Sequence, residues 1–261
     1  MYEERMCRIL LLIGSDRDEA RSLLDALAKA SECDPILSKL RGEECSKHDD
    51  GWGYALIGLK DGRKFSRYYR STSPIFEDIE LEELKETLNH LDTFSLIAHS
   101  RKMSKGEVSV FNTHPFHYSH RGFDLWFAHN GTVNDMELAA EMGLSYSEGI
   151  SDSFYLGNYV YERGIPGAFN HAKRFVKEGS AMNTVLLADR PLISVATAYY
   201  LAEDEVRIDY YRLFMSDGEN KAVFSSSIRD YIDLKYEELR NGLGVIFSLK
   251  NGEIDSKIFE I

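Results

Sequence analysis

Cysteine is scarce in this chain, and its placement excludes the usual cysteine frameworks. The 261 residues contain three cysteines, Cys7, Cys33 and Cys45, which are far apart and form no CxxC pair. An odd number of dispersed cysteines suggests neither a disulfide framework nor a structural zinc site. The pattern favours a reducing, cytoplasmic location, and we expect Cys33 and Cys45 to be incidental.

Positive charge and long apolar runs are also lacking. The 31 Lys and Arg residues face 43 Asp and Glu residues, for a formal net charge of -12. Nucleic-acid binding needs a clustered basic excess, and no basic stripe is present. The apolar run at residues 9–13 is too short for a signal sequence or a membrane span. We therefore expect no nucleic-acid partner and no membrane association.

The sequence does contain a series of strand and helix patterns. Apolar residues make up 43% of it, which is enough for one sizeable core. Because strands, helices and strands follow one another without regular βα alternation, we expect two sheets sandwiched between helices. Strands are predicted over residues 6–13, 52–59, 64–69, 94–99 and 123–129, with four or five more after residue 184, including 244–249 and 254–259. Helices are predicted from Asp16 and over residues 81–91, 135–142, 152–161 and 168–177.

Four polar clusters stand at the ends of predicted apolar elements. Taken singly, each has an ordinary explanation: Asn-Gly forms turns, Ser-Asp caps helices, and a cysteine in an apolar run packs in a core. Together they supply a thiol nucleophile, oxyanion donors, and partners for a carboxylate and an ammonium, which are the parts of an acyl-transfer site. The clusters are Cys7, His99-Ser100-Arg101, His129-Asn130-Gly131 and Ser151-Asp152-Ser153.

Six short motifs between residues 7 and 153 carry a resemblance. They are Cys7-Arg8-Ile9, HDDGWG from His48, AHSR ending at Arg101, NTHPF from Asn112, AHNG ending at Gly131, and Ser151-Asp152-Ser153. In this order and spacing, the set resembles the class II glutamine amidotransferase family, and most closely its members that consist of the glutaminase domain alone.

The resemblance implies an α+β fold of the N-terminal-nucleophile (Ntn) hydrolase type, with four αββα layers and two mainly antiparallel sheets between helical layers. It implies that Cys7 attacks the side-chain amide of glutamine to give a γ-glutamyl thioester and release ammonia. By the same resemblance, Asn130 and Gly131 form the oxyanion hole, and Arg101 and Asp152 bind the α-carboxylate and the α-amine. Supporting positions are Gly51, Trp52, Gly53, His99, His114 and His129, of which the two glycines would let backbone approach the nucleophile closely.

In this family the general base is the free α-amine of the nucleophilic cysteine. An α-amine and a thiol exchange a proton at little cost because their ordinary pKa values are about 8 and about 8.5, whereas a peptide nitrogen cannot act as this base. We therefore expect residues 1–6 to be an N-terminal extension that the working enzyme lacks. Either translation starts at Met6, which we favour, or the extension is a propeptide. Residues 7–261 are then the single amidotransferase domain.

The residues after Arg101 depart from the family pattern. Synthase-linked members carry a tryptophan and a threonine there, where this chain has Lys102, Met103 and Ser104. Ser104 can replace the hydroxyl in substrate binding, but the other two leave open whether the substrate is free glutamine or another γ-glutamyl amide or peptide. A catalytically silent glutamine-sensing subunit is a further alternative. We expect no acceptor domain, so ammonia passes to a separate synthase subunit or is released.

No cofactor and no metal are expected. The histidines His114, His117 and His120 are closely spaced, but Pro115 disfavours helical i, i+3 ligation, and no carboxylate or thiol completes a familiar ligand set. We interpret these histidines as residues that shape a loop over the site.

Overall fold

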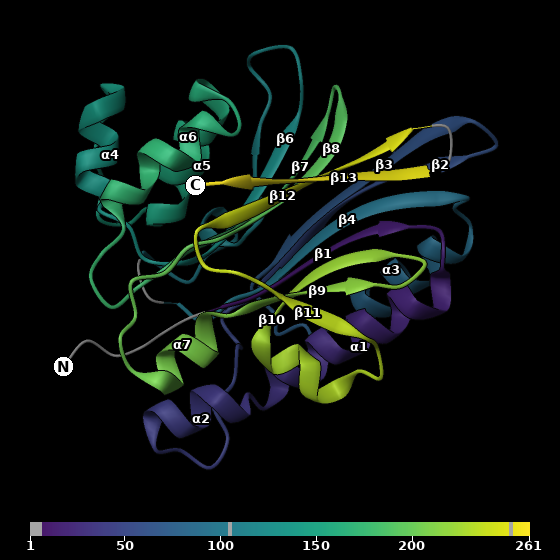
Figure 1. Ribbon diagram of the computed structural model, residues 1–261, viewed down its shortest axis with the longest axis horizontal. Coiled ribbons are helices and arrows are strands. Elements are labelled where there is room, and N and C mark those ends of the chain that lie inside the picture. The colour runs from purple at the N-terminus through teal and green to yellow at the C-terminus, as the bar shows by residue number, and fades with distance from the viewer. Residues whose placement is uncertain (1–6, 104–105, 251–252) are drawn as a thin grey trace.

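The computed structural model describes residues 7–103, 106–250 and 253–261, which form two sheets between helices (Figure 1). One sheet has seven strands in the order β11-β9-β10-β1-β4-β2-β3, and the other has six in the order β13-β12-β8-β7-β6-β5. Their strand pairings are antiparallel. The first sheet contains β1 (Arg8–Gly14), β2 (Trp52–Lys60), β3 (Arg63–Ser71), β4 (Thr93–Ser100), β9 (Leu213–Asp217), β10 (Lys221–Ser225) and β11 (Tyr236–Leu239). The second contains β5 (Phe116–Tyr118), β6 (Leu125–Gly131), β7 (Met182–Asp189), β8 (Leu192–Ala198), β12 (Leu243–Lys250) and β13 (Glu253–Glu260).

Helices cover the outer face of each sheet, which makes four layers. α1 and α3 pack on the first sheet, and α4, α5 and α6 pack on the second (Figure 1). The α-helices are α1 (Arg17–Glu32), α2 (Pro35–Arg41), α3 (Glu80–Asn89), α4 (Asp135–Met142), α5 (Asp152–Arg163), α6 (Gly167–Ala172) and α7 (Glu205–Tyr211). The short 3₁₀ helices are η1 (Val110–Asn112), η2 (Lys173–Phe175) and η3 (Ser226–Tyr231). This arrangement confirms the predicted αββα sandwich.

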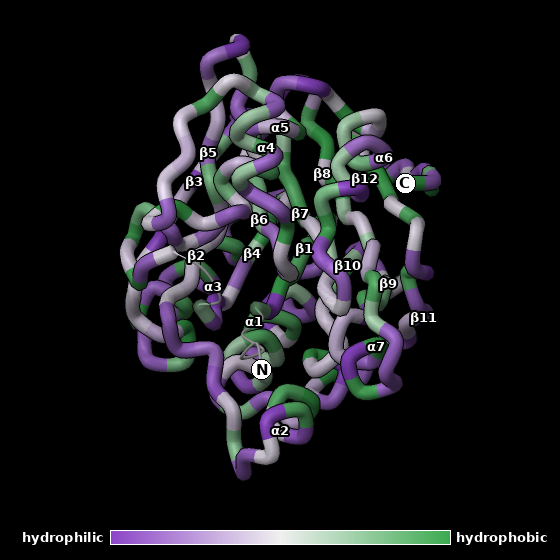
Figure 2. The backbone as a smooth tube through the Cα atoms, turned by 90° about the vertical axis from the view of Figure 1, so that its left-hand side faces the viewer, coloured by the Kyte–Doolittle hydropathy of each residue, from purple (hydrophilic) through white to green (hydrophobic). Residues whose placement is uncertain are grey.

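Strand β1 shows how the sequence produces these layers. Its side chains alternate, so that Leu10 and Leu12 pack toward the helices while Ile9, Leu11 and Ile13 pack between the two sheets. β4 and β10 flank it on either side. A strand buried on both faces has a continuous apolar sequence, as β1 does, and Figure 2 shows hydrophobic residues along β1, β7 and β8.

Local sequence signals account for several elements. α1 begins where it was predicted, and the Asp16 side chain caps it by accepting a hydrogen bond from the Glu19 backbone N–H. Asp61 and Gly62 both have positive φ angles, 50° and 71°, and form the hairpin turn that joins β2 to β3, between the strands predicted over residues 52–59 and 64–69. Seven strands follow residue 181 where four or five were predicted, and helices α2 and α7 were not predicted, because each has only seven residues.

The expectation for Cys33 and Cys45 is wrong. Their sulfur atoms are bonded to each other, and their Cα atoms lie 5.1 Å apart. The neighbouring residues Asp34 and Ser46 form an isolated antiparallel bridge that closes the loop around α2. This long-range pairing, which spacing alone does not reveal, brings the two cysteines together.

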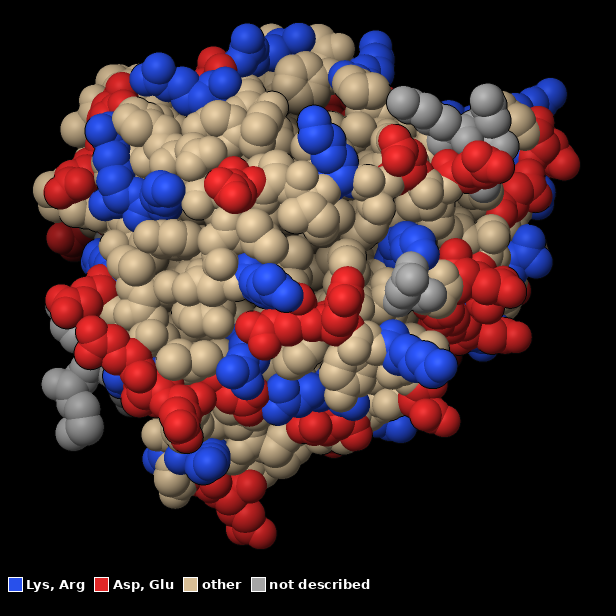
Figure 3. Space-filling view, viewed as in Figure 1, with Lys and Arg blue, Asp and Glu red and all other residues tan. Residues whose placement is uncertain are grey.

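The surface carries charges of both signs. On the face shown in Figure 3, acidic and basic side chains are interspersed. In the described part of the chain, no helix has the length and apolar character needed to cross a bilayer.

Candidate active site

The predicted nucleophile and its predicted partners come together at one end of the sheets. Cys7 immediately precedes β1, Arg101 immediately follows β4, and Asp152 opens α5. β1 and β4 run antiparallel, which places the start of the first beside the end of the second. The other sheet contributes Asn130, near the end of β6, whose Oδ1 accepts a hydrogen bond of 3.1 Å from the backbone nitrogen of Cys7.

This contact fixes the orientation of the Asn130 amide. Because Oδ1 is turned toward the Cys7 nitrogen, the Nδ2 group is the part of the amide left for another partner. Nδ2 is buried and has no hydrogen-bond partner among the described residues. A buried donor without a partner costs free energy and is rare in folded proteins. It lies beside Cys7, where it is available to donate to a bound group.

The tight turn predicted at Asn130-Gly131 is not present. Both residues lie in β6, opposite Asn183 and Met182 of β7. Gly131 has a φ angle of 126°, and a Cβ atom there would lie 1.9 Å from the carbonyl oxygen of Ala181. Glycine is therefore required both for the backbone conformation and for the close approach of the next strand.

Arg101 and Asp152 provide opposite charges in a nearly closed site, each with 2% of its surface exposed. Nη1 of Arg101 donates to the carbonyl oxygen of Glu107 at 3.2 Å. Burial lowers the pKa of Arg101, and nearby negative groups, Asp152 included, oppose that effect. The Asp152 carboxylate accepts the backbone N–H groups of Val133 and Ser153, each at 2.9 Å. Oδ1 also accepts the Ser151 hydroxyl at 3.4 Å, whereas Val133 is the one donor found for Oδ2 among the described residues. Because a carboxylate oxygen has about two acceptor positions, Oδ2 retains capacity for a bound ammonium.

The Cys7 side chain is buried against the peptide group of Lys102. Its Sγ accepts the Lys102 N–H at 3.4 Å, and its S–H donates to the Lys102 carbonyl at 3.5 Å. Burial raises the pKa of the thiol to about 11, although the Lys102 N–H and the charge of Arg101 favour the thiolate. At neutral pH the group is therefore a thiol and requires a base to become a nucleophile.

This raised pKa leads to a prediction for Cys7 while it remains peptide-bonded to Met6. The thiolate is the reactive form and accumulates only as the pH approaches about 11. We expect alkylation by iodoacetamide to be slow at pH 7 and to rise about tenfold per pH unit up to pH 10. Intact mass measured over time gives the rate, and Cys7→Ala controls for other labelling. A rate that already levels off near pH 8 would contradict the raised pKa.

The buried histidines near this site are neutral. The His129 ring accepts a hydrogen bond from Ser153 Oγ at 3.0 Å and donates to the Ala181 carbonyl at 3.2 Å, and burial lowers its pKa. His99 and His114 stack with ring centroids 4.0 Å apart. Burial lowers the pKa of both rings well below the ordinary value, and the charge of Arg101 lowers each further.

The other two histidines of the predicted loop do not join His114. His117 stacks on Trp126 and contacts Asp124 at 2.7 Å, whereas His120 pairs with Glu162. No cluster of three or more histidine, cysteine or acidic side chains suited to a metal is found within residues 7–103, 106–250 and 253–261.

The supporting glycines make close contacts, but at other places than expected. A Cβ atom on Gly51 would lie 2.5 Å from the Ser71 carbonyl oxygen, and one on Gly53 would lie 2.5 Å from the carbonyl oxygens of His114 and Tyr69. Their close approach is thus to β3 and to residues 113–114 rather than to Cys7. The Trp52 indole donates to Asp78 in the core under the helices. Ser104 and residues 1–6 lie outside the described residues.

A buried network surrounds Arg8, the residue after Cys7, and was not predicted from the sequence. Oδ2 of Asp34 accepts hydrogen bonds from Arg8 Nε at 2.5 Å, His48 Nε2 at 2.8 Å and Ser227 Oγ at 3.1 Å. The Arg8 guanidinium also stacks on the Tyr210 ring. A buried charge needs a partner. The arginine inside the apolar run of β1 was therefore the signal in the sequence that a buried acidic partner exists. The network anchors the strand that carries Cys7.

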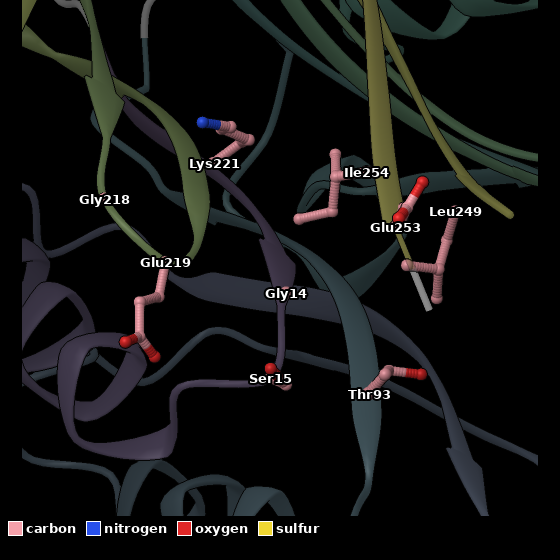
Figure 4. Close-up of a pocket in the computed structure, with 9 residues that line it drawn as sticks. All are labelled: Gly14, Ser15, Thr93, Gly218, Glu219, Lys221, Leu249, Glu253 and Ile254. Carbon is pink, nitrogen blue, oxygen red and sulfur yellow. The ribbon is translucent and has the colours of Figure 1, made fainter. Parts of the chain in front are cut away.

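A cavity of about 400 Å³ lies at the opposite end of β1 from Cys7 (Figure 4). Gly14 and Ser15 line it together with Thr93 and residues of the β9–β10 and β12–β13 segments. At about 3.3 Å per residue, the length of β1 separates it from the candidate active site by roughly 20 Å. It is therefore not part of that site.

Comparisons with known proteins relate part of the sequence, and the fold, to glutamine amidotransferases. The profile of the family described as glutamine amidotransferases class-II matches residues 34–153, which include Arg101, Asn130, Gly131 and Asp152 but not Cys7. A provisionally named glutamine amidotransferase of Haemophilus influenzae is 36% identical over 90 residues, which are 34% of this chain and 28% of that protein. The provisionally named glutamine amidotransferase YafJ of Escherichia coli is 34% identical over 94 residues, which are 36% of this chain and 34% of that protein. Each match thus spans about a third or less of the relative.

The fold has a solved counterpart in the glutamine phosphoribosylpyrophosphate amidotransferase of B. subtilis. The two structures superpose with a TM-score of 0.60 at 15% sequence identity, over 96% of this chain and 49% of the other. This likeness concerns the fold, which is that of the Ntn hydrolases. Residues 34–153 thus match the profile of the class II glutamine amidotransferases, and the chain shares its fold with this amidotransferase.

Proposed function

We propose that the chain is a cysteine-dependent amidohydrolase that releases ammonia from the side-chain amide of glutamine. The observation that carries the proposal is the Asn130 amide. Its Oδ1 holds the Cys7 nitrogen at 3.1 Å, and its buried Nδ2 has no partner among the described residues. One side chain thus joins the predicted nucleophile to a fixed donor, which an oxyanion next to that nucleophile requires.

In the proposed reaction, the Cys7 thiol gives its proton to the free α-amine of the same residue and attacks the γ-carbonyl carbon. The N–H groups of Asn130 Nδ2 and Gly131 bind the oxyanion of the tetrahedral intermediate. The proton then passes to the leaving nitrogen, ammonia departs, and a γ-glutamyl thioester remains. Water, deprotonated by the same amine, releases glutamate and restores the thiol.

Arg101 and Asp152 are the proposed partners of the amino-acid end of the substrate. A guanidinium binds a carboxylate in a fork of two hydrogen bonds, and the Asp152 carboxylate fits an α-ammonium. Both groups are buried with opposite charge, so a zwitterion would neutralise each of them. We assign Ser104 a contact to the same ligand on the basis of the family resemblance alone.

These contacts recognise the glutamyl part, which glutamine shares with other γ-glutamyl amides and peptides. The leaving group is therefore what separates the main proposal from its alternative, a hydrolase of another γ-glutamyl compound. No cofactor enters the proposed chemistry. Ammonia then passes to a separate synthase subunit or is released, and residues 7–261 act as one amidotransferase domain.

The test is to measure glutamate and ammonia release from glutamine and from γ-glutamyl dipeptides, with and without residues 1–6. We expect the protein to turn over glutamine, and we expect a glutamine-analogue electrophile to label Cys7. Faster turnover of a dipeptide would favour the alternative substrate. Binding of glutamine without turnover or labelling in either form would identify a silent, glutamine-sensing protein and refute the enzymatic proposal.

A further inference from the structure

We propose that the ion pair between Lys102 and Asp49 is a positioning element for Cys7, because it holds the Lys102 peptide group against Sγ. The inference rests on the proposed function, in which Cys7 is the nucleophile. It assigns a role to the lysine that stands where synthase-linked members of the family have a residue that helps to hold glutamine.

The segment after β4 is attached along its length to the segment before β2. The Arg101 N–H donates to the Gly51 carbonyl at 2.8 Å, and the Asp50 N–H donates to the Arg101 carbonyl at 3.1 Å. Further contacts that involve side chains extend this attachment: Nζ of Lys102 lies 2.7 Å from Asp49 Oδ1 and 3.9 Å from Asp50 Oδ2, and the Met103 N–H donates to Asp50 Oδ2 at 2.8 Å. The Lys102 ammonium is therefore bound by Asp49, and it is the peptide group of Lys102 that contacts Cys7.

That peptide group contacts Sγ through both of its polar atoms. The N–H lies 3.4 Å from sulfur and favours the thiolate, whereas the carbonyl at 3.5 Å accepts the thiol proton and favours the thiol. A hydrogen bond to a charged acceptor is about twice as strong as a neutral one, and S–H is a weak donor. The net effect of the contact therefore favours the thiolate, in opposition to the effect of burial.

The Lys102 N–H belongs to a loop, so its distance from Cys7 Sγ depends on the contacts that hold this loop in place. Lys102 has 18% and Asp49 41% of its side chain exposed, so the ion pair lies at the rim of the site and is not a core contact. Other charged or titratable groups also act on Cys7 from the surrounding elements. They are Arg8, Asp50, Arg101, Asp152 and Tyr210.

Positioning and direct charge effects predict different outcomes when the pair is broken. If the two residues acted on the thiol only through their charges, removal of the lysine would raise its pKa and removal of the aspartate would lower it. If they act by holding the Lys102 N–H in place, either removal raises the pKa. The two single variants, Lys102→Met and Asp49→Asn, therefore separate the explanations.

The experiment measures the pH dependence of Cys7 alkylation by iodoacetamide in the full chain. We expect both variants to react about tenfold more slowly than the wild type at each pH below the thiol pKa, which corresponds to a rise of about one unit. Lys102→Arg should retain most of the wild-type rate. Lys64→Met is the matched control because it breaks the 2.9 Å pair between Lys64 and Asp189, outside the candidate site, and should react like the wild type.

Shifts of opposite sign in the two variants, or wild-type rates in both, would overturn the positioning role. Because alkylation requires no glutamine, these results do not depend on the enzymatic proposal. Glutamine hydrolysis by the wild type, with and without residues 1–6, tests that proposal separately. Slower alkylation in both variants of a protein that never hydrolyses glutamine would retain the positioning role and remove the proposed reaction.

Discussion

A chain that begins at Cys7 is expected to hydrolyse glutamine about 10²–10⁴-fold faster than the same chain with residues 1–6 attached. This range is the usual contribution of a general acid or base. The reason is the state of one nitrogen atom, which donates to Asn130 Oδ1 at 3.1 Å. As a peptide nitrogen it accepts no proton, and the thiol pKa of about 11 leaves almost no thiolate at neutral pH. As a free amine it can take the thiol proton directly.

The measurement compares proteins expressed from Met1 and from Met6, with intact mass establishing which residues each retains. Cys7→Ala in both forms gives the background, and it should abolish activity without unfolding the protein. Full activity in a protein whose N-terminus is Met1 throughout would refute the free-amine base. Activity that survives Cys7→Ala would remove Cys7 from the mechanism.

Substitutions at Asn130 are expected to have the second largest effect. Loss of an oxyanion donor costs about 10²–10³-fold in kcat. Asn130→Ala removes both the Nδ2 donor and the acceptor of the Cys7 nitrogen, whereas Asn130→Asp keeps an acceptor oxygen and removes only the donor. We expect both to lower kcat by this factor with a much smaller change in KM, because Arg101 and Asp152 still bind the α-groups.

The aspartate variant makes this test specific. If Asn130 only anchored the Cys7 nitrogen, Asn130→Asp would keep most of the activity and Asn130→Ala would lose it. Thermal unfolding of both variants shows whether the fold is retained. An Asn130→Asp enzyme with the kcat of the wild type would rule out the oxyanion role.

Local signals in the sequence predicted the elements that local interactions build. The Asp16 cap and the buried face of Ala20, Leu23, Leu24 and Leu27 define α1, and the positive φ angles at Asp61 and Gly62 define the β2–β3 turn. The seven-residue helices α2 and α7 contain too few turns to show a helical period, and each packs against the other. Their presence depends on contacts between distant parts of the chain.

For the candidate site, the motifs identified residues that the fold brings together, but their contacts were not predictable. The bond from the Cys7 nitrogen to Asn130 links two sheets over 123 positions of sequence. The Asn130-Gly131 dipeptide was interpreted as a turn because turns commonly need a glycine with positive φ. In the structure, Gly131 has a positive φ angle within a strand, where it allows the close approach of Ala181. Asp34 carried no motif, and only the tertiary structure shows that it neutralises Arg8.

The central place of β1 determines when the site can be completed during protein synthesis. β1 pairs on one side with β4 and on the other with β10, and the Ile9 N–H donates to Ser225 Oγ at 2.9 Å. Ribosomes add about 5–20 residues per second, so β10 is made roughly ten to forty seconds after Cys7. Until then one edge of β1 lacks its partner strand. Removal of the residues ahead of Cys7, which the proposed mechanism requires, can therefore take place before β1 has both of its partner strands.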